Sequence, residues 1–157
     1  MNFKRVAATA LAIVFTLTIN PRSASASEQS DVTAAVHRYF DNLEKDKLET
    51  ALAMCDSHVS ILDEFPPHEW HGATACADWW KGLNAYDDKE GITDGEAQLG
   101  TPWTVDISGD RAYFVAPSTY TYKQHGKPVK ESQAVFTVAL KKTQAGWRIT
   151  AWTWSKH

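Results

Sequence analysis

One carboxylate in this 157-residue chain stands where its surroundings could turn it into a base. Asp63 ends the mostly apolar segment 59–62, and an acidic, aromatic and proline-rich corner of sequence EFPPHEWHG follows it. Apolar neighbours exclude water from a carboxylate and raise its pKa toward neutrality, which suits general-base proton transfer. A structural carboxylate that accepts backbone N–H groups before Pro66 has the same sequence signature, so both roles stay open.

Other chemistry finds little support in the sequence. His58, His68 and His71 lie near Asp63, but no HxH or HExxH pattern occurs. His68 and His71 are three residues apart, so they point to opposite faces of an extended segment. GxSxG and glycine-rich phosphate loops are also absent. We therefore expect no metal and no cofactor, and nothing favours a nucleophile.

Aromatic residues are the compositional anomaly of the chain. It carries seven tryptophans, all of them beyond residue 26. Aromatic side chains line both cores and ligand pockets, so their number alone does not separate the two. We expect some of them to be core and the group as a whole to line an apolar pocket, with these members: Phe65, Trp70, Trp79, Trp80, Trp103, Tyr120, Tyr122 and Trp152.

The first 26 residues are typical of an export signal. Lys4 and Arg5 precede an apolar run at 6–19, and Ala24-Ser25-Ala26 supplies a small-x-small cleavage pattern. The run rises about 21 Å as a helix, too short for a hydrocarbon core of about 30 Å. We predict cleavage before Ser27, a domain at 27–157, and a periplasmic or secreted protein. An uncleaved anchor is the alternative.

The net charge narrows the classes of possible partner. Cleavage would remove three of 16 basic residues and none of 19 acidic ones, leaving a net charge of −6. Nucleic acids and anionic membranes are therefore disfavoured as partners.

Cys55 and Cys76 are the only cysteines, each at helical spacing from apolar neighbours. In an exported protein an even count suggests a disulfide, although two separate buried thiols remain an alternative.

The periodicity along the chain predicts helices first and strands after them. An apolar stripe at 32–43 predicts the first helix, and further helices are expected at about 47–55 and 72–83. A short strand is expected at 58–62 and a mobile loop at 84–95. Alternating residues predict four later strands, at 103–107, 111–123, 129–142 and 147–156. This order defines an α+β fold with helices on one sheet face.

Apolar residues on both faces of the later strands suggest an interface. Ala112, Phe114 and Ala116 share one face of their strand, while Tyr113 and Val115 take the other. In the last strand Trp152 and Trp154 are expected to oppose Ile149 and Ala151. We predict a homodimer through the outer sheet face, with scattered surface aromatics as the alternative.

This order of elements resembles the nuclear-transport-factor-like superfamily, also called SnoaL-like or cystatin-like. The segments that carry the resemblance are AVHRYFDNLEKDKLETALAMC, VSILDEFPPHEWHG and GWRITAWTWS, and it covers nearly all of Ser30 to Ser155. The resemblance implies a cone of three helices and a curved antiparallel sheet around an internal pocket.

The middle segment resembles that of ketosteroid isomerase. That likeness implies a general-base role for Asp63 and a hydrogen-bond donor role for Tyr39, whose alternative is simple packing on the helix. It also requires a protonated aspartate on a late strand. The matching strand, 134–140, offers only Phe136, Val138 and Leu140 on its inward face.

Three functions are compatible with these observations. The first is an exported protein that binds a small apolar or aromatic molecule, and the missing late-strand acid favours it. The second is an isomerase or lyase that uses Asp63 as base and Tyr39 as donor. The third is a dimeric interaction module without catalysis.

Overall fold

The computed structural model describes residues 21–45 and 47–156, and the side chains from residue 25 onward in the first helix. The described part contains three helices and seven strands. Their bounds in chain order are α1 (Pro21–Glu44), α2 (Leu48–Leu52), β1 (Cys55–Leu62), β2 (Glu69–Gly72), α3 (Ala75–Glu90), β3 (Ile92–Leu99), β4 (Thr104–Ser108), β5 (Arg111–Gln124), β6 (Lys127–Thr143) and β7 (Gly146–Ser155).

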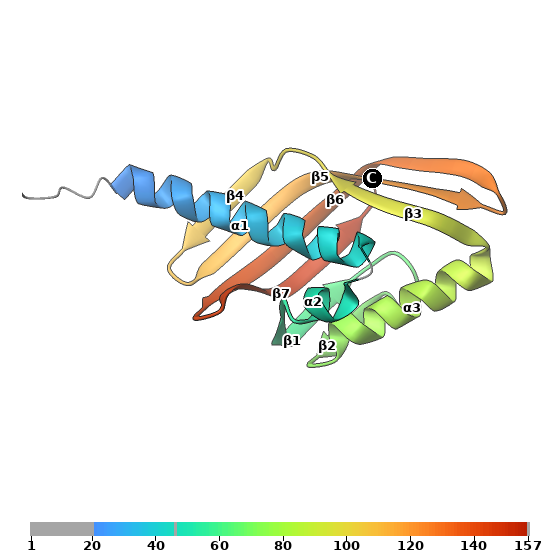
Figure 1. Cartoon of the computed structure of the whole chain (residues 1–157), viewed down its shortest axis with the longest axis horizontal. Coiled ribbons are helices and arrows are strands. Elements are labelled where there is room, and N and C mark those ends of the chain that lie inside the picture. The colour runs from blue at the N-terminus through green and yellow to red at the C-terminus, as the bar shows by residue number, and fades with distance from the viewer. Residues whose placement is uncertain (1–20, 46, 157) are drawn as a thin grey trace, which may run out of the picture.

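The strands form one curved, open sheet that the helices cover on its concave side (Figure 1). The strand order is β2-β1-β7-β6-β5-β3, with β4 also paired to β5. This is the α+β architecture that the sequence predicted. One detail differs, because β1 and β7 run parallel and the sheet is therefore mixed rather than wholly antiparallel.

The core lies where β5 and β6 face helix α1. The inward pairs Ala112↔Leu140, Phe114↔Val138 and Ala116↔Phe136 are all at most 5% exposed. The stripe of α1 packs on them, with Val32, Ala35 and Val36 fully buried and Tyr39 nearly so. The inward side chains of the strands alternate with period two, and the apolar side chains of the helix recur with period 3.6. The two sets pack against each other in one apolar layer.

A bulge in β7 changes the predicted facing of the last strand. Leu140 pairs with Ile149 but Ala139 pairs with Ala151, so Thr150 is an extra residue. An extra residue reverses the alternation beyond it. Ile149 and Trp152 are consequently both buried on the inner face. The expectation that Trp152 opposes Ile149 was wrong for this reason.

The segment 84–95, expected to be a loop, is regular structure instead. Helix α3 continues to Glu90 and ends at Gly91, whose φ of 64° is the left-handed conformation that glycine adopts easily. Tyr86 continues the apolar stripe of Trp79 and Leu83 at helical spacing and packs on the core. Strand β3 follows immediately and pairs with β5, a pairing partner that local pattern does not reveal.

A disulfide joins Cys55 to Cys76. The second helix is shorter than predicted, so Cys55 opens β1 rather than closing a helix, while Cys76 lies in the first turn of α3. A bridge that closes a loop of 21 residues contributes about 3 kcal/mol in the chain-entropy model. It fixes the start of α3 against the start of β1, the second strand of the sheet.

The predicted export signal is only partly within the described residues. Its basic start and apolar run at residues 4–19 lie outside them, and the expected cleavage point before Ser27 falls within α1. None of the helices in residues 21–45 and 47–156 has the length and apolar character needed to cross a bilayer.

Candidate functional site

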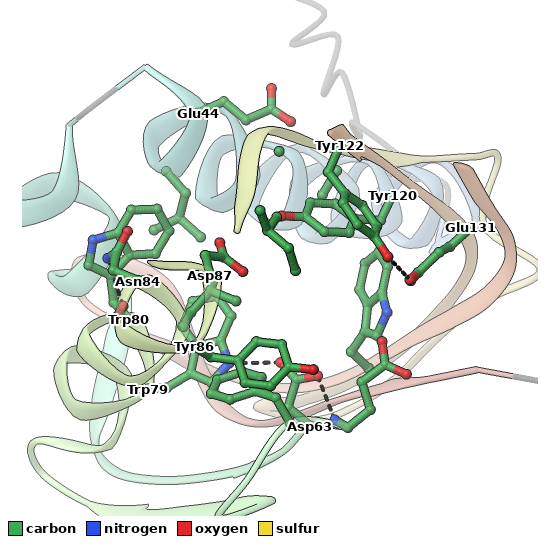
Figure 2. Close-up of a pocket in the computed structure, with 18 of the residues that line it drawn as sticks. Glu44, Asp63, Trp79, Trp80, Asn84, Tyr86, Asp87, Tyr120, Tyr122 and Glu131 are labelled. Carbon is green, nitrogen blue, oxygen red and sulfur yellow. Dashed lines mark hydrogen bonds between the residues drawn. The ribbon is translucent and has the colours of Figure 1, made fainter. Parts of the chain in front are cut away.

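A cavity of about 560 Å³ opens between the helices and the concave face of the sheet. Side chains of α1, α3 and strands β3, β5, β6 and β7 form its walls, and the end of β1 contributes Asp63 (Figure 2). Its walls are mainly aromatic and acidic. This combination is unusual, because aromatic walls exclude water and buried carboxylates need it.

Asp63 lies in this cavity, held by two donors. Its Oδ1 accepts the backbone N–H of Glu64 at 2.7 Å. Its Oδ2 accepts the indole N–H of Trp79 at 2.8 Å, the bond drawn in Figure 2. Burial raises the pKa of Asp63 to about 6, an increase that these two hydrogen bonds only partly offset. The carboxylate is thus both structurally held and poised to exchange a proton near neutral pH.

The proline-rich corner positions Asp63 at the end of β1. The backbone N–H of Asp63 donates to the carbonyl of His68 at 3.0 Å, and that of His68 donates to Phe65 at 2.9 Å. These bonds close a turn that brings β2 back antiparallel to β1. The turn directs Phe65 into the cavity wall, where it stacks against Tyr86 of α3 with ring centroids 5.4 Å apart.

Tyr39 lines the same cavity from α1. Its side chain is 1% exposed, and its hydroxyl has no hydrogen-bond partner among the described residues. Burial raises the pKa of Tyr39 well above its usual value; the Trp152 indole lowers that pKa by a smaller amount, and the Asp63 carboxylate raises it further. The phenol is therefore neutral and able to donate a hydrogen bond. The Trp152 indole N–H is likewise buried without a partner in the described part of the chain.

Most of the predicted pocket aromatics line the cavity. Six of the eight do so, namely Phe65, Trp79, Trp80, Tyr120, Tyr122 and Trp152. Trp79 contacts Trp152 edge-to-face, with centroids 4.8 Å apart and planes at 90°. This contact joins α3 to the floor of the cavity.

Two predicted pocket residues lie elsewhere. Trp70 is 9% exposed and packs on Phe65 and Gly82 beneath α3, so it is core rather than cavity wall. Trp103 precedes β4 and is 64% exposed, outside the cavity. Both errors have the same cause, since the side that an aromatic faces depends on strand pairings that the sequence does not reveal.

Acidic side chains other than Asp63 also line the cavity, and the sequence pattern did not predict them. Asp87 extends from α3 toward the middle of the cavity and Glu44 lies at its rim (Figure 2). Burial and the neighbouring Asp88 raise the pKa of Asp87 to about 6. Asp87 follows Trp80 by seven residues, so extending the helix past Leu83 would have identified it as facing the same side.

One cation lies among these acids. Lys156 Nζ is 2.8 Å from Glu64 and 2.7 Å from Glu131, and Tyr122 donates to Glu131 at 2.9 Å. Burial alone would lower the pKa of Lys156, but the bonds to Glu131 and Glu64 outweigh it and raise that pKa. All four residues of this group line the cavity. Among residues 21–45 and 47–156 there is no cluster of three or more side chains suited to hold a metal ion.

The fold and the cavity define a member of the nuclear-transport-factor-like superfamily, a class of small α+β proteins with an open cone. Residues 32–156 match the family model of the SnoaL-like domain, and the chain belongs to that family. No curated protein sequence matches it.

Solved structures agree on the fold. An NTF2-like protein with a cystatin-like fold from Novosphingobium aromaticivorans is 17% identical, with 85% of this chain and 84% of that chain covered and a TM-score of 0.68. An NTF2-like superfamily protein from Salmonella enterica is 16% identical over 84% and 92% of the two chains, with a TM-score of 0.68. A ketosteroid isomerase-like protein from Erwinia carotovora is 16% identical over 82% and 95%, with a TM-score of 0.64. At these identities the likeness concerns the fold alone.

The two hydrogen bonds of Asp63 lead to a test of its protonation. Replacing Trp79 by phenylalanine removes a donor that lowers the pKa of Asp63, so that pKa is expected to rise above 6. Carboxyl carbon NMR titration measures it. Trp80→Phe is the matched control, because Trp80 lines the cavity without bonding to Asp63. Equal pKa values in both variants would contradict the assignment.

The same titration predicts the sign of a stability change. Because burial raises the pKa of Asp63 from 3.8 to about 6, its contribution to the free energy of unfolding is fully present below about pH 4 and lost as pH rises through 6. Urea unfolding of the wild type and Asp63→Asn at pH 4 and pH 7 should show the variant lacking this part of the decline.

Proposed function

We propose that this SnoaL-like domain is exported and binds a small molecule with an apolar or aromatic body in its cavity. The observation that carries the proposal is an aromatic-walled cavity of about 560 Å³, within the range of about 300–1,000 Å³ typical of ligand pockets. Export rests on the signal-like pattern of residues 1–26.

Two unsatisfied polar groups in the cavity support ligand binding. The Tyr39 hydroxyl and the Trp152 indole N–H are both buried without a partner in the described residues. Leaving such a group unpaired costs about 1–3 kcal/mol. A ligand oxygen near them would recover this free energy, and the surrounding rings would bury its apolar body.

The binding proposal predicts that a bulky side chain in the cavity weakens ligand binding. Ala97 on β3 lines the cavity, so the larger side chain of Ala97→Phe is expected to lower the affinity for the ligand at least about tenfold by steric exclusion. Native mass spectrometry of protein purified from the periplasm or medium of its own host should find a co-purifying molecule, absent from this variant. Gln98→Phe is the matched control, since Gln98 is the next residue on β3 and is exposed outside the cavity. A wild type with no bound molecule, or equal loss in both variants, would contradict the proposal.

Proton transfer is the second candidate function. Asp63 and Tyr39 line the same cavity, and Asp63 has a pKa of about 6, near the optimum for a general base at neutral pH. In this isomerase or lyase scheme Asp63 would remove a proton beside a carbonyl group and Tyr39 would donate to its oxygen. The late-strand acid of ketosteroid isomerase has no counterpart at positions 134–140 of β6, since Phe136, Val138 and Leu140 are apolar and buried. Glu131 lines the cavity from the start of the same strand, but it is paired with Lys156.

The proton-transfer proposal predicts that replacing the Asp63 carboxylate by an amide strongly slows proton exchange. Asp63→Asn should lower deuterium incorporation into cyclic β,γ-unsaturated ketones in D₂O by about 10²–10⁴-fold, the usual contribution of a general base. Proton NMR follows the exchange, and urea unfolding checks that the variant folds. Asp110→Asn, in the exposed turn before β5, should exchange at the wild-type rate. An unchanged rate in Asp63→Asn would exclude this role.

We also propose a homodimer through the convex face of the sheet. The dimer is compatible with ligand binding and with proton transfer, and the third function, a non-catalytic interaction module, requires nothing else. Leu62, Thr153, Thr137 and Val115 form one row of paired residues on this face. Tyr113 lies beside Ala139 in the next row and is 48% exposed, while Leu62 is 52% exposed. Such a surface of small and apolar side chains suits packing of a second sheet.

The dimer proposal predicts that charge on this face separates the protomers. Tyr113→Arg places two like charges near the proposed two-fold interface and should shift the protein from dimer to monomer in sedimentation velocity. Gln144→Arg adds the same charge in the exposed β6–β7 turn and should leave the dimer intact. A wild type that sediments as a monomer at all concentrations would contradict the proposal.

A further inference from the structure

The charges around the cavity are strongly one-sided. Of the side chains that line it, seven are acidic and one is basic. The acidic residues are Glu44, Asp63, Glu64, Asp87, Asp88, Asp94 and Glu131, and the basic residue is Lys156.

Only some of these acids have a cation beside them. Glu64 and Glu131 share Lys156, and Asp94 pairs with Lys123 at 2.7 Å. The remaining four have no ion-pair partner among the described residues, namely Glu44, Asp63, Asp87 and Asp88. Of these four, Asp63 and Asp87 are partly buried and Glu44 and Asp88 are exposed. Burial raises the pKa values of Asp63 and Asp87, and repulsion from Asp88 raises that of Asp87 further.

A second observation places an unused polar group at the same cavity. The Tyr39 side chain is 1% exposed, lines the cavity and has a hydroxyl without a partner in residues 21–45 and 47–156. Its oxygen is an acceptor as well as a donor. The electron-rich faces of tryptophan and tyrosine rings also attract cations, and Trp79, Trp80 and Tyr120 are among the rings of the wall.

We propose that the ligand of this cavity is an organic cation, an ammonium or quaternary ammonium group on an apolar body. The proposal rests on the proposed function and specifies its ligand class. A positive group between Asp63, Asp87 and the rings would relieve the carboxylate repulsion and gain cation–π attraction. An anionic ligand would meet repulsion from every unpaired acid, and a neutral one would leave them uncompensated.

Three probes that share one apolar body test the charge preference. Calorimetry with the purified protein at pH 7.5 compares 4-phenylbutyltrimethylammonium, 4-phenylbutanol and 4-phenylbutyrate. The cation should bind at least about tenfold tighter than the alcohol, with the carboxylate weakest. Added salt should weaken the cation and leave the alcohol unchanged.

Matched variants connect the preference to the cavity acids. Asp87→Asn should weaken the cation about tenfold and change the alcohol by less than about twofold, because only the charge is removed. Asp106→Asn is the control, since Asp106 is exposed on β4 and lies outside the cavity. A cation that binds no tighter than the alcohol, or equal losses in the two variants, would overturn the ligand class and leave the pocket proposal standing. If none of the three probes binds, the pocket proposal fails together with this inference.

Discussion

The hydrogen bond from the Trp79 indole to Asp63 is the contact on which the cavity depends. It joins helix α3 to the end of β1, while the disulfide joins the same helix to the start of that strand. The same indole contacts Trp152 of β7 edge-to-face, so one side chain ties the helix both to the acid and to the floor of the sheet. A rigid aromatic that carries one polar atom can satisfy a buried carboxylate and still exclude water from it. The helix is thereby held over the concave face while the space beside it stays open.

The cavity combines two properties that usually oppose each other. Aromatic walls lower the polarity around Asp63 and Asp87, and this desolvation is the main reason that the pKa of each is raised to about 6. Keeping acids in such a place costs stability, because each prefers water to a low-dielectric wall. Functional sites are where proteins commonly hold groups at that cost. The unpaired Tyr39 hydroxyl and Trp152 indole N–H add to this cost in folding stability.

Apart from Asp63, the acids of this pocket lie at different positions than in the enzyme that the sequence resembles. The inward side of β6 is apolar at Phe136, Val138 and Leu140. Further carboxylates come from α3, where Asp87 enters the cavity, from the end of α1, where Glu44 borders it, and from Glu131 near the start of β6. A shared fold with relocated charges is a sound reason not to transfer a reaction from the family to this chain.

The sequence by itself determined the class of fold and the central acid. The 3.6-residue stripe at 32–43 and the strict alternation of Ala112, Phe114 and Ala116 are local properties, and each fixes which side of an element is buried. Asp63 was identifiable because an apolar strand and a proline corner flank it directly. The structure places it in the cavity with Tyr39.

Only the tertiary structure decided what surrounds that acid. The bulge at Thr150 reversed the face of Trp152, and the register of neighbouring strands placed Trp103 on the surface and Trp70 in the core. Helix α3 extends to Glu90 because Tyr86 packs on the core, and this extension alone places Asp87 in the cavity. Register, helix length and charge around a cavity all depend on contacts between residues far apart in the chain, and no local pattern encodes those distances.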